Sequence, residues 1–272
     1  MGASGSSAFS PPRVLRVVMI GTRDARRLVR DWETMQTWYL AVREARFERM
    51  LDLLGSRLPP DFRALDLGSG PGSLSARILA RFPRSRCVAL DYDPVLMTIG
   101  RAWSPPGSDR LTWVEADLRT KDWPAKLGRE RFDAIVSTTA LHWLSASELR
   151  ATYREAWKLL RKGGIFLNGD RATVGPRERT LKRMGTAIHQ DAMRARGGKD
   201  LGHPWTAWWK EARRYPSLRP LFEERERRFP KLDHQDPDLP ASVHLQYLRA
   251  AGFSEAEVLW RDLSNAITVG IK

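Results

Sequence analysis

The part of this chain best suited to bind a ligand is a turn with three glycines at alternate positions. A short apolar run, residues 64–67, precedes the turn, and an amphipathic run, residues 74–82, follows it. A glycine-rich turn between a strand and a helix allows a ligand to contact the backbone directly. Asp66 stands just before the first glycine, and its carboxylate would attract the cationic end of a ligand and repel a pyrophosphate. The glycines are Gly68, Gly70 and Gly72.

The spacing of this turn excludes two common phosphate-binding motifs. A dinucleotide-binding turn has a third glycine three residues after its second, where this chain has Ser73. A P-loop ends in Gly-Lys-Ser or Gly-Lys-Thr, and residues 64–75 contain no lysine. The turn therefore predicts a ligand with a cationic end.

A second strand-like run supplies an acid that could bind a ribose. Asp91 ends residues 86–91 and lies 25 positions after Asp66. This is close to the spacing at which a strand-end carboxylate meets ribose hydroxyls in a doubly wound sheet. The carboxylate can accept hydrogen bonds from both hydroxyls. Asp93 and Pro94 then favour a helix start, as an N-cap and a first-turn proline.

The order of these landmarks resembles the class I S-adenosylmethionine-dependent methyltransferases. Residues 66–72 match their motif I, Asp-x-Gly-x-Gly-x-Gly. Three further strand-like runs follow in the family's order, at residues 86–91, 111–115 and 132–139. The fifth landmark, residues 159–170, contains a glycine pair and then a strand-like run at 165–167. The resemblance implies S-adenosylmethionine as the cofactor, and the ammonium and sulfonium groups of that molecule suit Asp66.

The resemblance also implies roles for single residues. Asp117 would lie beside the adenine amino group, Leu118 would pack on the ring, and the end of the run 132–139 would face the transferred methyl group. The cofactor-binding residues implied in this way are Asp66, Gly68, Ser69, Gly70, Asp91, Tyr92, Asp117, Leu118 and Ser137.

The segment after the fourth strand-like run narrows the resemblance. Methyltransferases that act on exocyclic amines of nucleobases typically carry Asn/Asp-Pro-Pro-Tyr/Phe there, whereas residues 137–144 read Ser-Thr-Thr-Ala-Leu-His-Trp-Leu. This His-Trp segment resembles the trans-aconitate methyltransferase-like group of small-molecule enzymes. The resemblance covers most of residues 60–170 and 243–272, and it leaves the segment between them unassigned.

His142 is the candidate catalytic residue. An imidazole titrates near neutral pH and could remove a proton from a hydroxyl or amine acceptor. A carboxylate acceptor would need no base, and in the alternative interpretation His142 only packs beside the cofactor. No cluster of His, Cys and acidic residues has metal-ligand spacing, so we predict no metal.

The alternation of strand and helix signals predicts a doubly wound, Rossmann-like α/β fold with a seven-stranded sheet whose last strand is antiparallel. Ser145 and Glu148 form a capping box, and Gly163 with Gly164 is expected to stop the helix that follows. The predicted parts are a flexible tail with at most one short strand (1–22), an N-terminal helical cap (23–60), the cofactor-binding domain (61–170 and 242–272) and a helical lid or substrate insertion (171–241).

The insertion is basic and rich in tryptophan. Residues 171–231 hold only seven acidic side chains, so much of the net charge of +14 is concentrated there. Three interpretations are open for this segment. Its tryptophans could form a small helical core, or they could bind an anionic or aromatic acceptor together with nearby arginines. In the third interpretation the basic surface binds RNA. Glutamates at 223, 224 and 226 favour a salt-bridged helix face over RNA. The substrate-binding candidates are Trp143, Arg171, Trp205 and Trp208.

Composition favours a cytoplasmic enzyme that needs no metal ion or disulfide bond for stability. A chain of 272 residues buries about three-quarters of its unfolded surface. The single cysteine, Cys87, is expected to be buried and cannot form an internal disulfide. No apolar run reaches the length of about 18 residues that a membrane span requires, so no membrane partner is predicted. We expect a monomer or a homodimer.

These patterns predict methyl transfer from S-adenosylmethionine to an O or N nucleophile of a small molecule, carboxylates included, by in-line displacement. Two alternatives stay open, namely an RNA methyltransferase and a non-catalytic version of the fold that only binds the cofactor. The intact acids Asp66, Asp91 and Asp117 argue against a lost cofactor site.

Overall fold

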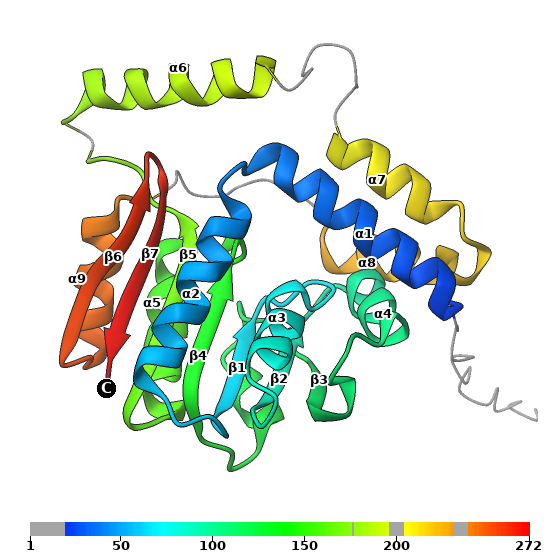
Figure 1. The fold of residues 1–272 in the computed structure, drawn as a ribbon, viewed down its shortest axis with the longest axis horizontal. Coiled ribbons are helices and arrows are strands. Elements are labelled where there is room, and N and C mark those ends of the chain that lie inside the picture. The colour runs from blue at the N-terminus through cyan, green and yellow to red at the C-terminus, as the bar shows by residue number, and fades with distance from the viewer. Residues whose placement is uncertain (1–19, 176, 196–203, 231–238) are drawn as a thin grey trace, which may run out of the picture.

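The computed structural model describes residues 20–175, 177–195, 204–230 and 239–272, and Figure 1 shows its fold. Seven strands form one sheet in the order β3-β2-β1-β4-β5-β7-β6. All neighbouring strands are parallel except β7, which is antiparallel to both β5 and β6. The predicted fold class is confirmed. The strands are β1 Arg63–Leu67, β2 Arg86–Asp91, β3 Leu111–Glu115, β4 Phe132–Thr138, β5 Leu160–Arg171, β6 Glu255–Asp262 and β7 Asn265–Ile271.

Helices cover both faces of the sheet because strand side chains alternate between the faces. Helices α2 (Arg43–Arg57) and α3 (Ser73–Arg81) bury their apolar sides against one face. Helices α5 (Ala146–Leu159) and α9 (Ala241–Ala251) cover the other face. Cys87 is buried under the first of these layers, as predicted. The two layers leave the carboxyl ends of β1 to β5 together at one edge of the sheet.

The N-terminal helical segment consists of two helices. Helix α1 (Thr22–Tyr39) ends before Leu40, and α2 begins at Arg43. The helices separate because they pack on different surfaces. Helix α2 lies on the sheet, whereas α1 packs on α4 (Pro94–Trp103) in a third hydrophobic cluster. The expected tail, with its short strand, lies almost entirely in residues 1–19, outside the described residues.

Two predicted helix starts are confirmed, and one predicted helix stop is wrong. Asp93 caps α4, and Ser145 forms the capping box of α5 with Glu148. Gly163 and Gly164 do not end α5, which already ends at Leu159; both lie inside β5. A Cβ on Gly164 would lie 2.9 Å from a backbone oxygen of the preceding turn, so the glycines serve the irregular start of the strand.

The insertion after β5 divides into a packed part and an outlying helix. Helices α7 (Pro204–Arg213) and α8 (Arg219–Arg228) pack against α1 and α4. Helix α6 (Arg179–Ala195) has no buried residue and lies apart from the helical layers (Figure 1). Short 3-10 turns, η1 Ser108–Arg110, η2 Trp123–Leu127, η3 Leu141–Trp143 and η4 Pro216–Leu218, complete the described fold.

Candidate active site

The predicted glycine turn lies at the carboxyl edge of the sheet, between β1 and α3. Gly68, Gly70 and Gly72 all adopt left-handed backbone angles, which favour glycine. A Cβ on Gly68 would lie 2.5 Å from the Cβ of Ala140, which follows β4. The amides of Gly68 and Ser69 donate to the carbonyl of Leu90 at 2.9 and 3.1 Å. The turn is therefore held against the ends of β2 and β4, with no room for a side chain at its first glycine.

Asp91 connects this turn to the end of β2. Its carboxylate accepts hydrogen bonds from the amides of Gly70 at 2.6 Å, Tyr92 at 2.7 Å and Asp93 at 2.8 Å. Burial raises the pKa of Asp91 to about 6. Asp91 thus lies where the sequence placed it, at a strand end beside the glycine turn. Its contact with a ribose stays a prediction.

Asp66 is fully buried below the glycine turn. One carboxylate oxygen accepts from the amide and the hydroxyl of Ser75, at 3.1 and 2.7 Å, and the other oxygen has no hydrogen-bond partner. The buried hydroxyl of Ser69 has no partner either. Burial raises the pKa of Asp66 to about 7. Two polar atoms without partners at the same turn fit a ligand that supplies donors to them.

The end of β3 carries Asp117 in an ion pair. Its carboxylate oxygens accept from Nε and Nη2 of Arg119 at 2.8 and 2.7 Å. The same guanidinium lies 5.8 Å from the ring centre of Tyr92 and 5.3 Å from that of Phe229, beyond α8. Leu118 is half-buried beside them. Residues of β2, β3 and the insertion therefore meet at the edge predicted for the adenosine group.

The ends of β4 and β5 bring His142 and Asp170 together. Nδ1 of His142 lies 2.7 Å from Oδ1 of Asp170, and the backbone amide of His142 donates to Oδ2 at 3.1 Å. Both side chains are more than nine-tenths buried. Burial alone would raise the pKa of Asp170, but His142 and Arg46 outweigh it and hold that pKa well below its usual range. The carboxylate stays ionised and fixes the imidazole.

Arg46 is a buried cation beneath this pair, and the sequence analysis missed it. Its side chain is 1% exposed, and Nη2 donates to the hydroxyls of Thr138, at 2.8 Å, and Thr139. Burial lowers the pKa of Arg46 to about 10, and the charge of Asp170 opposes this effect. A Cβ on Gly169 would lie 3.2 Å from the Arg46 side chain. Its position on the otherwise apolar stripe of residues 43–57 is the sequence feature that could have indicated a buried arginine.

Asp170 was missed as a functional residue for a different reason. It was seen only as the last residue of a strand-like run, while its partner lies 28 positions earlier. Ser137, at the end of β4, is buried and donates to the carbonyl of Leu67 at 2.7 Å. This bond ties β4 to β1 next to the glycine turn.

The four predicted substrate-binding residues lie in two places. Trp143 has its ring centre 5.3 Å from that of His142, and the amide of Arg171 donates to Asp170 at 2.8 Å. These two lie at the carboxyl edge. Trp208 is buried, and its indole N–H donates to the Leu28 carbonyl at 3.0 Å. Its ring, and that of Trp205, pack on a tryptophan of α1 (Trp32) at 4.9 and 5.7 Å.

Arginines of α8 are used inside the protein. Arg225 pairs with Asp93 at 2.5 Å, and Arg228 donates to the Tyr92 carbonyl at 2.9 Å and pairs with Glu115. Both arginine side chains are less than 15% exposed. This part of the basic insertion anchors α8 to the ends of β2 and β3.

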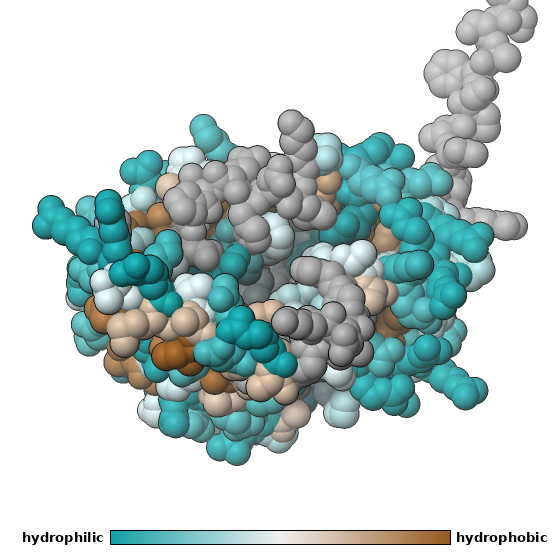
Figure 2. Space-filling view, turned by 90° about the horizontal axis from the view of Figure 1, so that it is seen from above, coloured by the Kyte–Doolittle hydropathy of each residue, from teal (hydrophilic) through white to brown (hydrophobic). Residues whose placement is uncertain are grey.

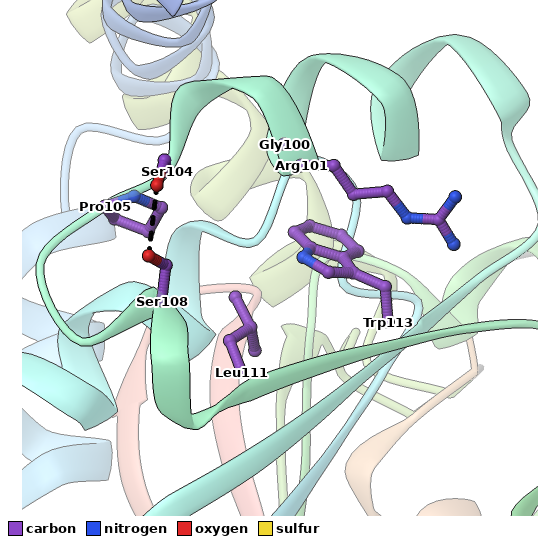
Figure 3. Close-up of a pocket in the computed structure, with 7 residues that line it drawn as sticks. All are labelled: Gly100, Arg101, Ser104, Pro105, Ser108, Leu111 and Trp113. Carbon is purple, nitrogen blue, oxygen red and sulfur yellow. Dashed lines mark hydrogen bonds between the residues drawn. The ribbon is translucent and has the colours of Figure 1, made fainter. Parts of the chain in front are cut away.

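A shallow pocket of about 260 Å³ lies elsewhere, between α4 and β3. Figure 3 shows Trp113 and Leu111 on β3 facing the hydrogen-bonded hydroxyls of Ser104 and Ser108. It contains none of the predicted site residues.

Within the described residues, no group of three or more His, Cys, Asp or Glu side chains could hold a metal ion. No described helix is long and apolar enough to cross a membrane.

Comparison with known proteins defines the class of this fold. Residues 64–164 match the family model of a methyltransferase domain. The chain is 36% identical over 122 residues to a trans-aconitate 2-methyltransferase of Streptomyces avermitilis, which is 43% of this chain and 42% of that protein. It is 29% identical over 127 residues to a tRNA1(Val) (adenine(37)-N6)-methyltransferase of Porphyromonas gingivalis, 42% of this chain and 50% of that protein.

Solved structures agree with this class. An O-methyltransferase family protein from Burkholderia thailandensis matches 90% of this chain and 61% of its own, with a TM-score of 0.54 and 17% identity. The chain spans half or less of the length of the two curated relatives above. Residues 64–164 thus form the core of a class I methyltransferase fold. The cofactor of this class is S-adenosylmethionine, which the glycine turn and the two polar atoms without partners fit.

Proposed function

We propose that this protein transfers a methyl group to an oxygen or nitrogen atom of a small molecule whose nucleophile must first lose a proton. The observation that carries this proposal is the buried pair of His142 and Asp170, which meet at 2.7 Å at the carboxyl edge. A carboxylate that orients an imidazole is the arrangement of an activated base. A carboxylate acceptor is already an anion and would not need this pair.

The chain's own residues would hold the cofactor in the following way. S-adenosylmethionine, when bound, supplies an electrophilic methyl group on its sulfonium. Asp66 and Ser69 offer buried polar atoms without partners, Asp91 would accept from the ribose hydroxyls, and Asp117 with Leu118 would meet the adenine. The whole set that we propose is Asp66, Gly68, Ser69, Gly70, Asp91, Tyr92, Asp117, Leu118 and Ser137.

His142 takes the proton, and Asp170 orients the imidazole. Because Asp170 accepts from Nδ1, the lone pair of the neutral imidazole is on Nε2, which takes the acceptor's proton. Asp170 then stabilises the imidazolium. The rest of the barrier is lowered by alignment, which contributes up to about 7–11 kcal/mol for well-oriented groups. We propose that Trp143 and Arg171 hold the apolar and anionic parts of the acceptor.

The packed part of the insertion acts as a cover in this proposal. Helices α7 and α8 form a fixed cover over the cofactor side of the site, because Arg225 and Arg228 tie α8 to Asp93 and to Tyr92. Trp205 and Trp208 support this cover as its core. Helix α6 is not part of the packed cover.

Methyl transfer to RNA is the second candidate. The net charge of +14 and the tRNA methyltransferase among the relatives favour it. Two observations weigh against it. The end of β4 lacks the Asn/Asp-Pro-Pro-Tyr/Phe segment, and two arginines of α8, Arg225 and Arg228, are occupied by Asp93 and Glu115.

Calorimetry tests the cofactor half of the proposal. Folded protein freed of carried-over cofactor should release heat with S-adenosylmethionine and with S-adenosylhomocysteine. Absence of heat with both ligands would contradict the proposal, whatever the acceptor is.

A further inference from the structure

Helix α6 presents an apolar stripe that nothing in the described structure covers. Leu181, Met184 and Ile188 follow one another at spacings of three and four residues, so they share one side of the helix. Their exposed fractions are 55%, 56% and 52%. A stripe of this kind normally faces a core. Here it belongs to a helix of 17 residues without a single buried residue.

The remaining sides of α6 are basic. Arg179, Lys182, Arg183 and Arg194 are all exposed, and Asp191 is the one acidic residue of the helix, in a pair with Arg194. Glu178 precedes the helix. A helix with an apolar stripe, basic flanks and low mean hydropathy is typical of segments that lie in the interface of a lipid bilayer.

The charge of the helix selects its partner. Two copies of this chain would bring two basic helices together on proteins of net charge +14, which disfavours self-association through α6. An anionic surface attracts the same side chains, at a gain that adds up over each lysine and arginine. An interfacial helix needs no long apolar run, so it differs from a membrane-spanning helix.

The position of α6 fits a docking role. The helix begins eight residues after β5 ends, on the carboxyl side of the sheet. Leu263, 41% exposed, lies at the same edge, because Asn265 pairs with Arg171 at the end of β5. Figure 2 shows this face from above, where apolar side chains (brown) are interspersed among hydrophilic ones (teal).

We propose that α6 docks this protein on an anionic lipid surface, with Leu181, Met184 and Ile188 inserted between the lipids and the basic side chains at the headgroups. Three inserted side chains give weak, reversible binding. The docked face is the carboxyl edge that carries His142, so the candidate site faces the lipid. The absence of a membrane partner was predicted from the lack of a spanning segment, and an interfacial helix needs none.

Vesicle sedimentation tests this inference without any methyl acceptor. The probes are vesicles of phosphatidylcholine alone and of phosphatidylcholine with one-quarter phosphatidylglycerol, at about 0.15 M salt. We expect the full chain to bind the anionic vesicles at least about tenfold more tightly than the neutral ones. The double variant Leu181→Ser, Ile188→Ser should lose this binding, and Lys182→Gln, Arg183→Gln should weaken it by about 30-fold.

Two matched controls separate α6 from general effects. Leu259→Ser changes an equally exposed apolar residue on β6, and Arg23→Gln, Arg26→Gln removes two exposed charges from α1. Both controls should bind as the wild type does. The proposal is overturned if the anionic vesicles are not preferred, or if the controls lose binding equally. It is also overturned if Ile188 instead controls dimer formation in ultracentrifugation, or if the α6 variants keep vesicle binding.

Discussion

The imidazole of His142 and the carboxylate of Asp170 form a buried pair across the ends of β4 and β5, 2.7 Å apart. Parallel pairing of the two strands creates this contact, since Thr138 lies beside Gly169 in the register. Arg46 places a positive charge next to Asp170 and helps to keep it ionised. The pair is therefore built by three elements, since His142 lies on η3 just after β4, Asp170 on β5 and Arg46 on α2.

Replacement of Asp170 by Asn tests the pair. Without the carboxylate, the tautomer of His142 is no longer fixed and the imidazolium is not stabilised. We expect turnover of a hydroxyl or amine acceptor to fall about 100-fold or more, the contribution of a positioned base. Asp122→Asn, a change at an exposed acid, is the control. Wild-type turnover of the Asp170 variant at every pH would show that the pair is only structural.

Asp91 and Asp93 should separate cofactor binding from stability. Asp91→Asn should weaken S-adenosylhomocysteine binding by about 1.5–3 kcal/mol, the size of a hydrogen bond to a charged group. Asp93 caps α4 by accepting from the amides of Val95 and Leu96. Asp93→Ala removes this cap and the ion pair with Arg225, and should cost at least about 1–2 kcal/mol of unfolding free energy. Calorimetry and urea unfolding measure the two effects, and the reverse pattern would place the ribose site at Asp93.

The stability of the cofactor-free protein should rise as the pH falls from about 7 toward 4. Burial raises the pKa of Asp66 to about 7 and that of Asp91 to about 6, above the value of 3.8 that a solvated aspartate has. The folded state then holds protons that the unfolded state releases. Their contribution is complete below 3.8 and is lost as the pH rises through the folded values, at about 1.4 kcal/mol for each pKa unit.

Thermal unfolding of wild type and Asp66→Asn at a series of pH values measures this dependence. The amide cannot titrate, so the variant should gain less stability on acidification than the wild type. An equal gain in both proteins would show that Asp66 is ionised in the folded protein throughout this range.

Trp208 and Trp143 should respond to substitution in opposite ways. Trp208→Ala removes a buried ring and the hydrogen bond to Leu28, and should cost about 3–5 kcal/mol of unfolding free energy. Trp143 is 36% exposed beside His142, so Trp143→Ala should change stability by less than about 1 kcal/mol. It should raise KM for the acceptor and leave cofactor affinity intact. A stable Trp208→Ala protein that fails to bind its acceptor would show that Trp208 belongs to the acceptor-binding site.

The strands and the acids at their ends could be predicted because local pattern determines them. The glycine turn, Asp91 and the cap at Asp93 each depend on residues within a few positions of one another. The pair of His142 and Asp170 could not be predicted, because strand register brings together residues that are 28 positions apart. Arg46 was missed since a charged residue on an apolar helix stripe gains its partners only from the tertiary fold.

The tryptophans of the insertion show the same limit. Their clustering in the sequence is compatible with a substrate wall and with a hydrophobic core. Only the packing of α7 on α1 places Trp208 against Trp32. The helix stop at Gly163 was wrong for a related reason, because a left-handed glycine serves a strand irregularity as well as a helix end.

The most direct test of the central claim follows the methyl group itself. Protein is incubated with S-adenosylmethionine labelled in the methyl group and with a cell extract separated into small-molecule and RNA fractions, at about 0.15 M salt. We expect label in a small molecule, and loss of that label with Asp170→Asn while S-adenosylhomocysteine still binds. Label found only in RNA, or no transfer by folded protein that binds the cofactor, would contradict it.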